Sequence, residues 1–239
     1  MIIDAAALDF QALGRQVRAC ADDELIIENC QGQRFIAAGR SAGRVTLRGT
    51  AGNALGAYLD GATLIVNGNA QDATGDTMNA GEIIVHGSAG DAPGYAMRGG
   101  RILIKGNAGY RAGIHMKAYK ERVPVMVIGG RAGSFLGEYQ AGGRIVVLGL
   151  GEEGPIVGNF CGTGMHGGVM YLRTKVLPPQ LPAQVSAHVA TDEDKAVIQG
   201  DIEAYCAHFG GDAGAMLADD YFVLLPDTKN PYKRHYVHN

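Results

Sequence analysis

Short apolar runs recur along the chain at nearly constant spacing. They occupy residues 45–47, 63–66, 83–85, 102–104, 125–128 and 145–148, and a seventh run, 169–172, follows an irregular stretch. Runs of three or four residues rich in Val and Ile, with glycine beside them, are typical of short buried strands. The pattern therefore predicts one strand per repeat.

A glycine motif follows each of the first five of these strands. The opening glycines are Gly49, Gly68, Gly87, Gly106 and Gly130, each with an alanine two places later and a second glycine seven places later. Three of the four steps between copies are 19 residues, and the fourth is 24, which indicates a five-residue insertion. A fixed period of this size is the sign of a repeat architecture.

The period decides which repeat architecture we expect. Nineteen residues leave no room for a helical crossover between parallel strands, but at about 3.3 Å per residue they close a ring of roughly 60 Å. We therefore predict an all-β solenoid, a right-handed parallel β-helix of about seven turns with short flanking helices. The right hand follows because 19 breaks the rhythm of left-handed hexapeptide repeats. Glycines are expected at corners that need positive φ.

The rest of the chain divides into two flanking segments. Residues 1–40 are predicted to form a cap, with a helix over 5–20 started by Asp4 and strands at 24–28 and 34–38. The β-helix is expected over 41–175. In 176–239 we expect an arm that carries a helix from the capping box at Thr191–Asp194 to Gly210, a strand at 221–225 and a basic, aromatic tail.

Composition limits the classes of function. Net charge is 21 − 24 = −3, which is too small to indicate nucleic acid or an anionic membrane as the main partner. The four cysteines, at 20, 30, 161 and 206, form no CxxC pair. The acidic start and the lack of an 18-residue apolar run lead us to expect a cytoplasmic protein.

Catalytic motifs are weak. Two stretches, 149–154 and 162–167, match G-x-G-x-x-G, but the first holds Glu152 and Glu153, which would repel a pyrophosphate, and Pro155 follows without a helix. Cys161 and His166 could form a nucleophile and its base, although a buried loop cysteine is the favoured interpretation. The histidines lack metal-ligand spacing. We predict no catalytic, cofactor-binding or metal-ligating residue.

The insertion at 115–124 is the best candidate for a binding site. Insertions in repeat proteins map to loops that often lie on the binding face. The predicted partner-docking residues are basic or aromatic: His115, Lys117, Tyr119, Lys120 and Arg122. The alternative is a solvated bulge. The tail at 227–239 could likewise fold onto a partner or onto the chain's own flank.

The glycine pattern as a set resembles the GXGXG domain of the glutamate synthase large subunit, in its stand-alone form. The likeness covers about residues 24–173 and includes the phrases GNAGYRAGIHMKAYKERVPVMVIGG and AGSFLGEYQAGGRIVVLGL. The resemblance implies a non-catalytic subunit that holds a glutamine amidotransferase subunit and an FMN-binding synthase subunit in register. FMN and an iron–sulfur cluster would then belong to those partners.

Related families share the repeat and keep other functions open. They are the GXGXG-containing subunit of formylmethanofuran dehydrogenase, the related subunit of the formyltransferase/hydrolase complex, and the corresponding subunit of N-methylglutamate synthase. A stand-alone structural module and a free-standing enzyme using Cys161 and His166 are further alternatives. A fold does not fix a function, so the repeat alone cannot separate them.

Overall fold

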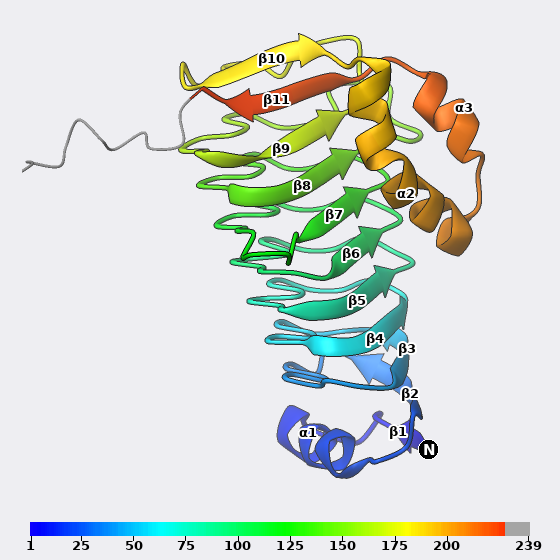
Figure 1. The fold of residues 1–239 in the computed structure, drawn as a ribbon. Helices are drawn as coiled ribbons and strands as arrows, with labels where there is room; N and C mark the ends of the chain where they lie inside the picture. The colour runs from blue at the N-terminus through cyan, green and yellow to red at the C-terminus, as the bar shows by residue number, and fades with distance from the viewer. Residues whose placement is uncertain (228–239) are drawn as a thin grey trace, which may run out of the picture.

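One sheet of eleven strands runs the length of the protein in a computed structural model that describes residues 1–227 (Figure 1). The spatial order is β1-β2-β3-β4-β5-β6-β7-β8-β9-β11-β10, so the chain adds strands one after another until the last two exchange places. The strands are β1 (Ile2–Asp4), β2 (Glu24–Gln31), β3 (Arg44–Thr50), β4 (Asp60–Asn67), β5 (Ala80–Val85), β6 (Arg101–Ile104), β7 (Val125–Ile128), β8 (Ala141–Val147), β9 (Gly167–Leu172), β10 (Val185–Val189) and β11 (Phe222–Pro226).

The sequence period is the step from one strand to the next. Leu64 pairs with Ile83 and Ile83 with Ile102, each 19 residues further on, in parallel register. Ile102 then pairs with Met126, a step of 24 that spans the insertion. All seven predicted strands are confirmed, from β3 to β9.

The predicted fold class is wrong. In place of an all-β solenoid built as a right-handed parallel β-helix, the described residues form a single open, mostly parallel sheet accompanied by three helices. A β-helix would need further strands in the segments that join these strands. These segments contain left-handed residues such as Ala54, Ala73 and Ala92 instead, so they form turns, and these turns contact the next repeat through separate hydrogen bonds and isolated bridges.

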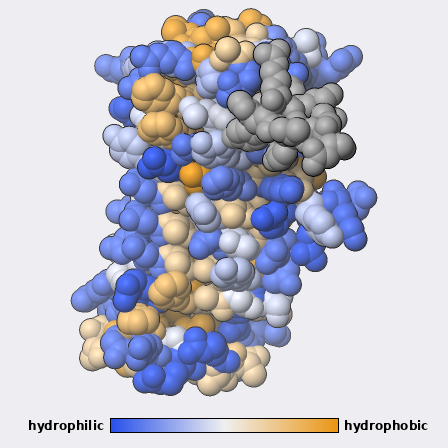
Figure 2. Space-filling model, turned by 90° about the vertical axis from the view of Figure 1, so that its left-hand side faces the viewer, coloured by the Kyte–Doolittle hydropathy of each residue, from blue (hydrophilic) through white to orange (hydrophobic). Residues whose placement is uncertain are grey.

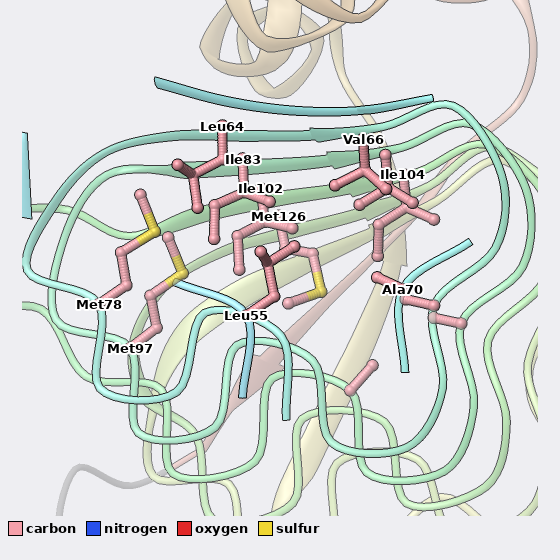
Figure 3. Close-up of a cluster of buried hydrophobic side chains, with 14 of the residues drawn as sticks. Leu55, Leu64, Val66, Ala70, Met78, Ile83, Met97, Ile102, Ile104 and Met126 are labelled. Carbon is pink, nitrogen blue, oxygen red and sulfur yellow. The ribbon is translucent and has the colours of Figure 1, made fainter. Parts of the chain in front are cut away.

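The sheet and the turns of each repeat nevertheless enclose an apolar interior. Figure 3 shows the side chains of Leu64, Ile83 and Ile102 following one another in a column, with Met78 and Met97 in a second column. All five are fully buried. Equivalent residues of successive repeats thus pack on one another, and we call each repeat with its turns a layer.

Polar ladders fasten the turns of adjacent layers. Asn69 Oδ1 accepts a hydrogen bond from the Ser88 amide at 2.8 Å, and Ser88 Oγ accepts one from the Asn107 amide at 3.0 Å. A parallel ladder links Asp72 Oδ1 to the Asp91 amide at 2.9 Å. These side chains satisfy turn amides that would otherwise lack a partner.

The opening glycines are required by this close stacking. A Cβ on Gly87 would collide with Asn69 Oδ1 of the layer before it. The expectation of positive φ holds at the opening glycine Gly49, with φ +113°, and is wrong at Gly87. It also holds at the second glycine of a repeat, as at Gly75 with φ +71°.

The N-terminal end differs from its prediction in two places. Helix α1 (Phe10–Ala19) begins after Asp9, whose side chain accepts from the Ala12 amide, and Asp4 lies in β1. Residues 34–38 form turns because Phe35 and Ala37 have positive φ. Figure 1 shows α1 covering this end of the sheet.

Helices α2 (Asp192–Phe209) and α3 (Ala213–Ala218) lie on the outer face of the sheet (Figure 1). The predicted capping box at Thr191 and Asp194 and the predicted stop at Gly210 are both confirmed. Buried α2 side chains pack on outward-facing strand residues; the cluster includes Ile198, Ile202, Tyr205, Leu103, Val127 and Val146. The boundaries proposed at 40/41 and 175/176 stay predictions.

One buried ion pair fixes α2 to the sheet. Arg144 of β8 donates from Nε to Asp201 Oδ2 at 2.8 Å and from Nη2 to Asp201 Oδ1 at 3.2 Å. The Asp201 side chain is only 8% exposed. The arrangement is the two-pronged contact at which arginine binds carboxylate most strongly.

We expect Gly75→Val to destabilise the protein by about 3 kcal/mol, because the new side chain adds backbone strain and overpacks the interior. A Cβ at this position would lie 2.5 Å from Ile102 Cδ1 and 3.3 Å from Ile83 Cδ1. Chemical denaturation of the purified chain measures the change in unfolding free energy. Gly39→Val is the matched control, since Gly39 has φ +70° and no atom within 4 Å of its Cβ position. Equal losses in both variants would contradict the packing argument.

Removing the buried carboxylate with Asp201→Ala should cost about 2–3 kcal/mol, because Arg144 would be left partly buried without its partner. Arg48→Ala provides the comparison: Arg48 pairs with Glu28 at 2.8 Å, but its side chain is 59% exposed. The loss there should stay below about 1 kcal/mol. Thermal unfolding followed by circular dichroism tests both variants. A similar small loss at Asp201 would show that this ion pair contributes little to holding α2 on the sheet.

Candidate protein-docking surface

The predicted insertion folds as a small hairpin ahead of β7. The Tyr119 amide donates to the Arg122 carbonyl at 2.9 Å, and the Arg122 amide donates to the Tyr119 carbonyl at 3.0 Å. Lys120 lies at the turn with φ +53°, its Nζ 5.3 Å from the centre of the Tyr119 ring. Arg122 reaches Asp60 of β4 at 3.6 Å. Together with Lys117, these side chains are exposed.

The fifth predicted residue, His115, is separated from the hairpin and joins a row of aromatic side chains. Its ring stacks on Tyr139 with centres 5.2 Å apart and an interplanar angle of 9°. Its other side meets the Tyr95 ring edge-on at 5.9 Å. We call Tyr95, His115 and Tyr139 the aromatic row. Because it crosses consecutive layers, the row runs along the stack.

A second set of side chains lies beside this row. The Arg111 guanidinium stands 5.0 Å from the centre of the Phe135 ring, which stacks on Phe160 at 5.1 Å. Arg111 also donates from Nε to Glu138 Oε2 at 2.9 Å. Glu138 is next to Tyr139 in the chain, so this ion pair connects the two sets. The combined surface presents an arginine among partly exposed aromatic rings.

Sequence reasoning found His115 and missed the other members of this surface. A signal was available in the layer register: Tyr58, Thr77, His115 and Tyr139 each lie two places after the second glycine of a repeat. In the structure each of these residues has positive φ and faces outward in the same column. Aligning the repeats by layer would have placed His115 next to Tyr139.

This surface has the chemistry of a protein-binding site. Tyrosine, arginine and large rings are enriched at the centres of protein interfaces, where they bury much area at little entropic cost. Figure 2 shows a face of the stack on which apolar residues gather near both ends, with a pale column between them. Whether the five predicted residues contact a partner stays a prediction.

The alternative catalytic pair is placed unfavourably for catalysis. Cys161 is fully buried, with its Sγ 3.8 Å from Met170 Sδ. It lies at the interior position that Leu136 occupies in the preceding layer. Burial raises the pKa of the Cys161 thiol to about 12. His166 Nδ1 lies 3.0 Å from the Gly164 carbonyl oxygen. A thiol with so high a pKa is protonated near neutral pH and is a poor nucleophile.

The second glycine-rich stretch, 162–167, begins in a turn. Gly162 and Gly164 have positive φ and shape the turn of a layer, followed by the buried Met165. Across residues 1–227, no three His, Cys, Asp or Glu side chains are grouped so that they could hold a metal ion.

We expect Cys161 to resist iodoacetamide in the folded protein at pH 8, where a thiol of this pKa is about 0.01% thiolate, and to react once guanidinium unfolds the chain. Cys30, whose pKa burial raises to about 11, should behave in the same way. The partly exposed Cys206 serves as the internal control and should react first. Mass spectrometry of the labelled peptides gives the rates. Rapid native labelling of Cys161 would reopen the case for a nucleophile.

None of the helices within residues 1–227 has the length and apolar character needed to cross a membrane.

Comparison with known proteins identifies the family. An uncharacterized protein of Methanocaldococcus jannaschii is 41% identical over 251 residues, covering 99% of this chain and 96% of that protein. Among solved structures, a chain of the formyltransferase/hydrolase complex from Methylorubrum extorquens, determined with methylofuran, has the same fold at 21% identity. Its TM-score is 0.62, and the match covers 92% of this chain and 89% of that one. The family described by the GXGXG motif matches residues 24–229. The chain therefore belongs to the GXGXG motif family.

Proposed function

We propose that this chain is a non-catalytic subunit of a multi-subunit enzyme and that its outer surface positions the catalytic subunits. The observation that carries the proposal is the aromatic row beside Arg111 and Phe135, placed on a stack whose interior is filled with side chains. Such a surface can bury aromatic rings against a partner while the regular layers hold its shape.

The glutamate synthase resemblance supports the finer proposal. In it, a glutamine amidotransferase subunit and an FMN-binding synthase subunit dock on this chain in the cytoplasm. FMN and an iron–sulfur cluster would reside in the partners. The placement of the four cysteines supports this assignment: Cys20 ends α1, Cys30 lies in β2, Cys161 is interior and Cys206 belongs to α2. A cluster needs several cysteine thiolates converging on one point.

A second candidate is a subunit of a formyltransferase/hydrolase-type complex. The observation that favours it is the solved Methylorubrum extorquens chain, which matches almost the whole of this one. The GXGXG-containing subunits of formylmethanofuran dehydrogenase and of N-methylglutamate synthase are variants of the same proposal. Partner identity separates these candidates, because the catalytic chemistry would lie in the partners.

We expect the tagged chain, purified from its own host, to retain an amidotransferase and an FMN-binding synthase subunit. The assembled complex should catalyse glutamine-dependent amination of 2-oxoglutarate. Activity should disappear when this chain is omitted from reconstitution. Capture of formyltransferase subunits instead would favour the second candidate. A homogeneous homo-oligomer with no enzymatic partner would reject both and leave a stand-alone module.

The same preparation tests the aromatic row. Combining His115→Ala with Tyr139→Ala should weaken partner retention by about 30-fold, the loss expected for a central pair of interface residues that contributes about 2 kcal/mol. Tyr58→Ala is the matched control, because Tyr58 has the same backbone conformation and is 59% exposed but lies several layers away. Equal partner retention by both variants would show that the partner binds outside the aromatic row.

A further inference from the structure

A groove runs along α1 at the N-terminal end of the stack. It consists of two neighbouring cavities of about 400 and 470 Å³, which share Gly14, Arg18 and Phe35. One cavity lies between α1 and residues 37–42, and the other follows the Phe10 side of the helix. Helix α1 precedes the residues matched by the GXGXG family, whereas Phe35 and residues 37–42 lie within them, so the groove is formed between the helix and the matched region.

Gly14 forms part of the groove although packing does not require a glycine there. A glycine inside a helix costs about 1 kcal/mol relative to alanine. The nearest atom to a Cβ on Gly14 would be Arg18 Nη1 at 3.4 Å, the movable end of a long side chain. Gly14 therefore lowers the stability of the helix, and its lack of a side chain keeps the bottom of the groove open.

Phe35 forms an exposed wall of the same groove. Its side chain is 48% exposed and its φ is +58°, a conformation that bulky residues adopt at a cost. The equivalent position in the next layers is Ala54 and then Ala73. The Phe10 ring lies 6.4 Å from Phe35, with the Arg34 guanidinium 4.6 Å from the Phe10 centre. These rings offer an apolar contact next to positive charge.

The charge of the groove indicates what it binds. Arg15, Arg18 and Arg34 have no carboxylate within 4.0 Å in the described part of the chain. Asp9 is engaged as the helix cap, and Asp22 pairs with the terminal amine. Arginine binds carboxylates through two parallel hydrogen bonds. The chain's own segment 228–239 is basic, with Lys229, Lys233 and Arg234 in the sequence, so its charge does not complement the groove.

We propose that this groove docks an acidic polypeptide segment of a catalytic partner subunit, with carboxylates on Arg15 and Arg18 and an apolar side chain against Phe35. This inference rests on the proposed function, because it names a second contact of the same partners. The elongated, two-lobed shape along α1 favours an extended segment over a compact small molecule.

The test uses the full chain and fluorescein-labelled peptides that tile the sequences of the captured partner subunits. We expect an Asp- or Glu-rich peptide to bind the wild-type chain and to lose at least about tenfold in affinity with Arg15→Gln combined with Arg18→Gln. Gln16→Glu is the control, since it lowers the net charge on the same helix outside the groove. Its effect should be under about twofold.

Gly14→Leu provides a second variant that fills the groove without changing charge. Leucine is the better helix former, so this variant should unfold no earlier than the wild type, yet lose the peptide. The wild-type chain could capture partners while the Arg15, Arg18 and Gly14 variants bind the peptide as well as the wild type does. That result would overturn the proposal that the groove binds the peptide and leave the proposed function intact. Failure to capture any catalytic partner would overturn both. Groove-dependent binding of inorganic phosphate alone, or groove-dependent dimerisation, would assign the groove to another occupant.

Discussion

The close approach of each layer to the next is the constraint on which the rest of the structure depends. Asn69, Ser88 and Asn107 reach across to the amide of the following layer, and the glycine of that layer lies against the same oxygen. The hydrogen bond needs the short distance, and the short distance excludes a Cβ. The polar residue of one layer and the glycine of the next layer are therefore both needed for this close stacking, and we call the pair the stacking device.

This constraint also explains why each layer contributes a strand to one sheet only, while its other segments form turns. Tight stacking demands sharp turns, which the chain makes with left-handed residues at Ala54, Ala73 and Ala92. Left-handed residues interrupt extended pairing, so ladders there shrink to single bridges such as Ala70 with Ala89. The long strands remain where β-branched residues alternate inward and outward, and α2 covers their outer face through Ile198 and Ile202.

Much of the strand arrangement was predictable because it depends on spacing. The 19-residue period fixes the register of Leu64 with Ile83 without any knowledge of tertiary contacts. The fold class could not be obtained in this way, because a period does not reveal which segments of a layer extend and which turn. Residues 34–38 show the same difficulty: their apolar sequence suggests a strand, but Phe35 and Ala37 adopt turn conformations imposed by the neighbouring layer.

Only part of the candidate docking surface could be predicted from the sequence, for a related reason. Its hairpin is an insertion and is visible as a departure from the period, whereas the pairing of His115 with Tyr139 appears only when the layers are aligned on one another.

In this stack, surface loops can change in length, whereas the residues of the interior are constrained by packing. Five extra residues enter between Met116 and Val125, yet Met126 still pairs with Ile145 at the usual step of 19. Lengthening an exposed loop costs little entropy, about 0.6 kcal/mol for each doubling. Changes at interior positions are more costly, because a buried polar group needs a partner. Gln140 replaces a methionine in the column of Met78 and Met97, and its Oε1 has no hydrogen-bond partner among residues 1–227. Binding features can thus be added at turns and ends, as at the hairpin and α1, while the stacking device keeps every later layer in register.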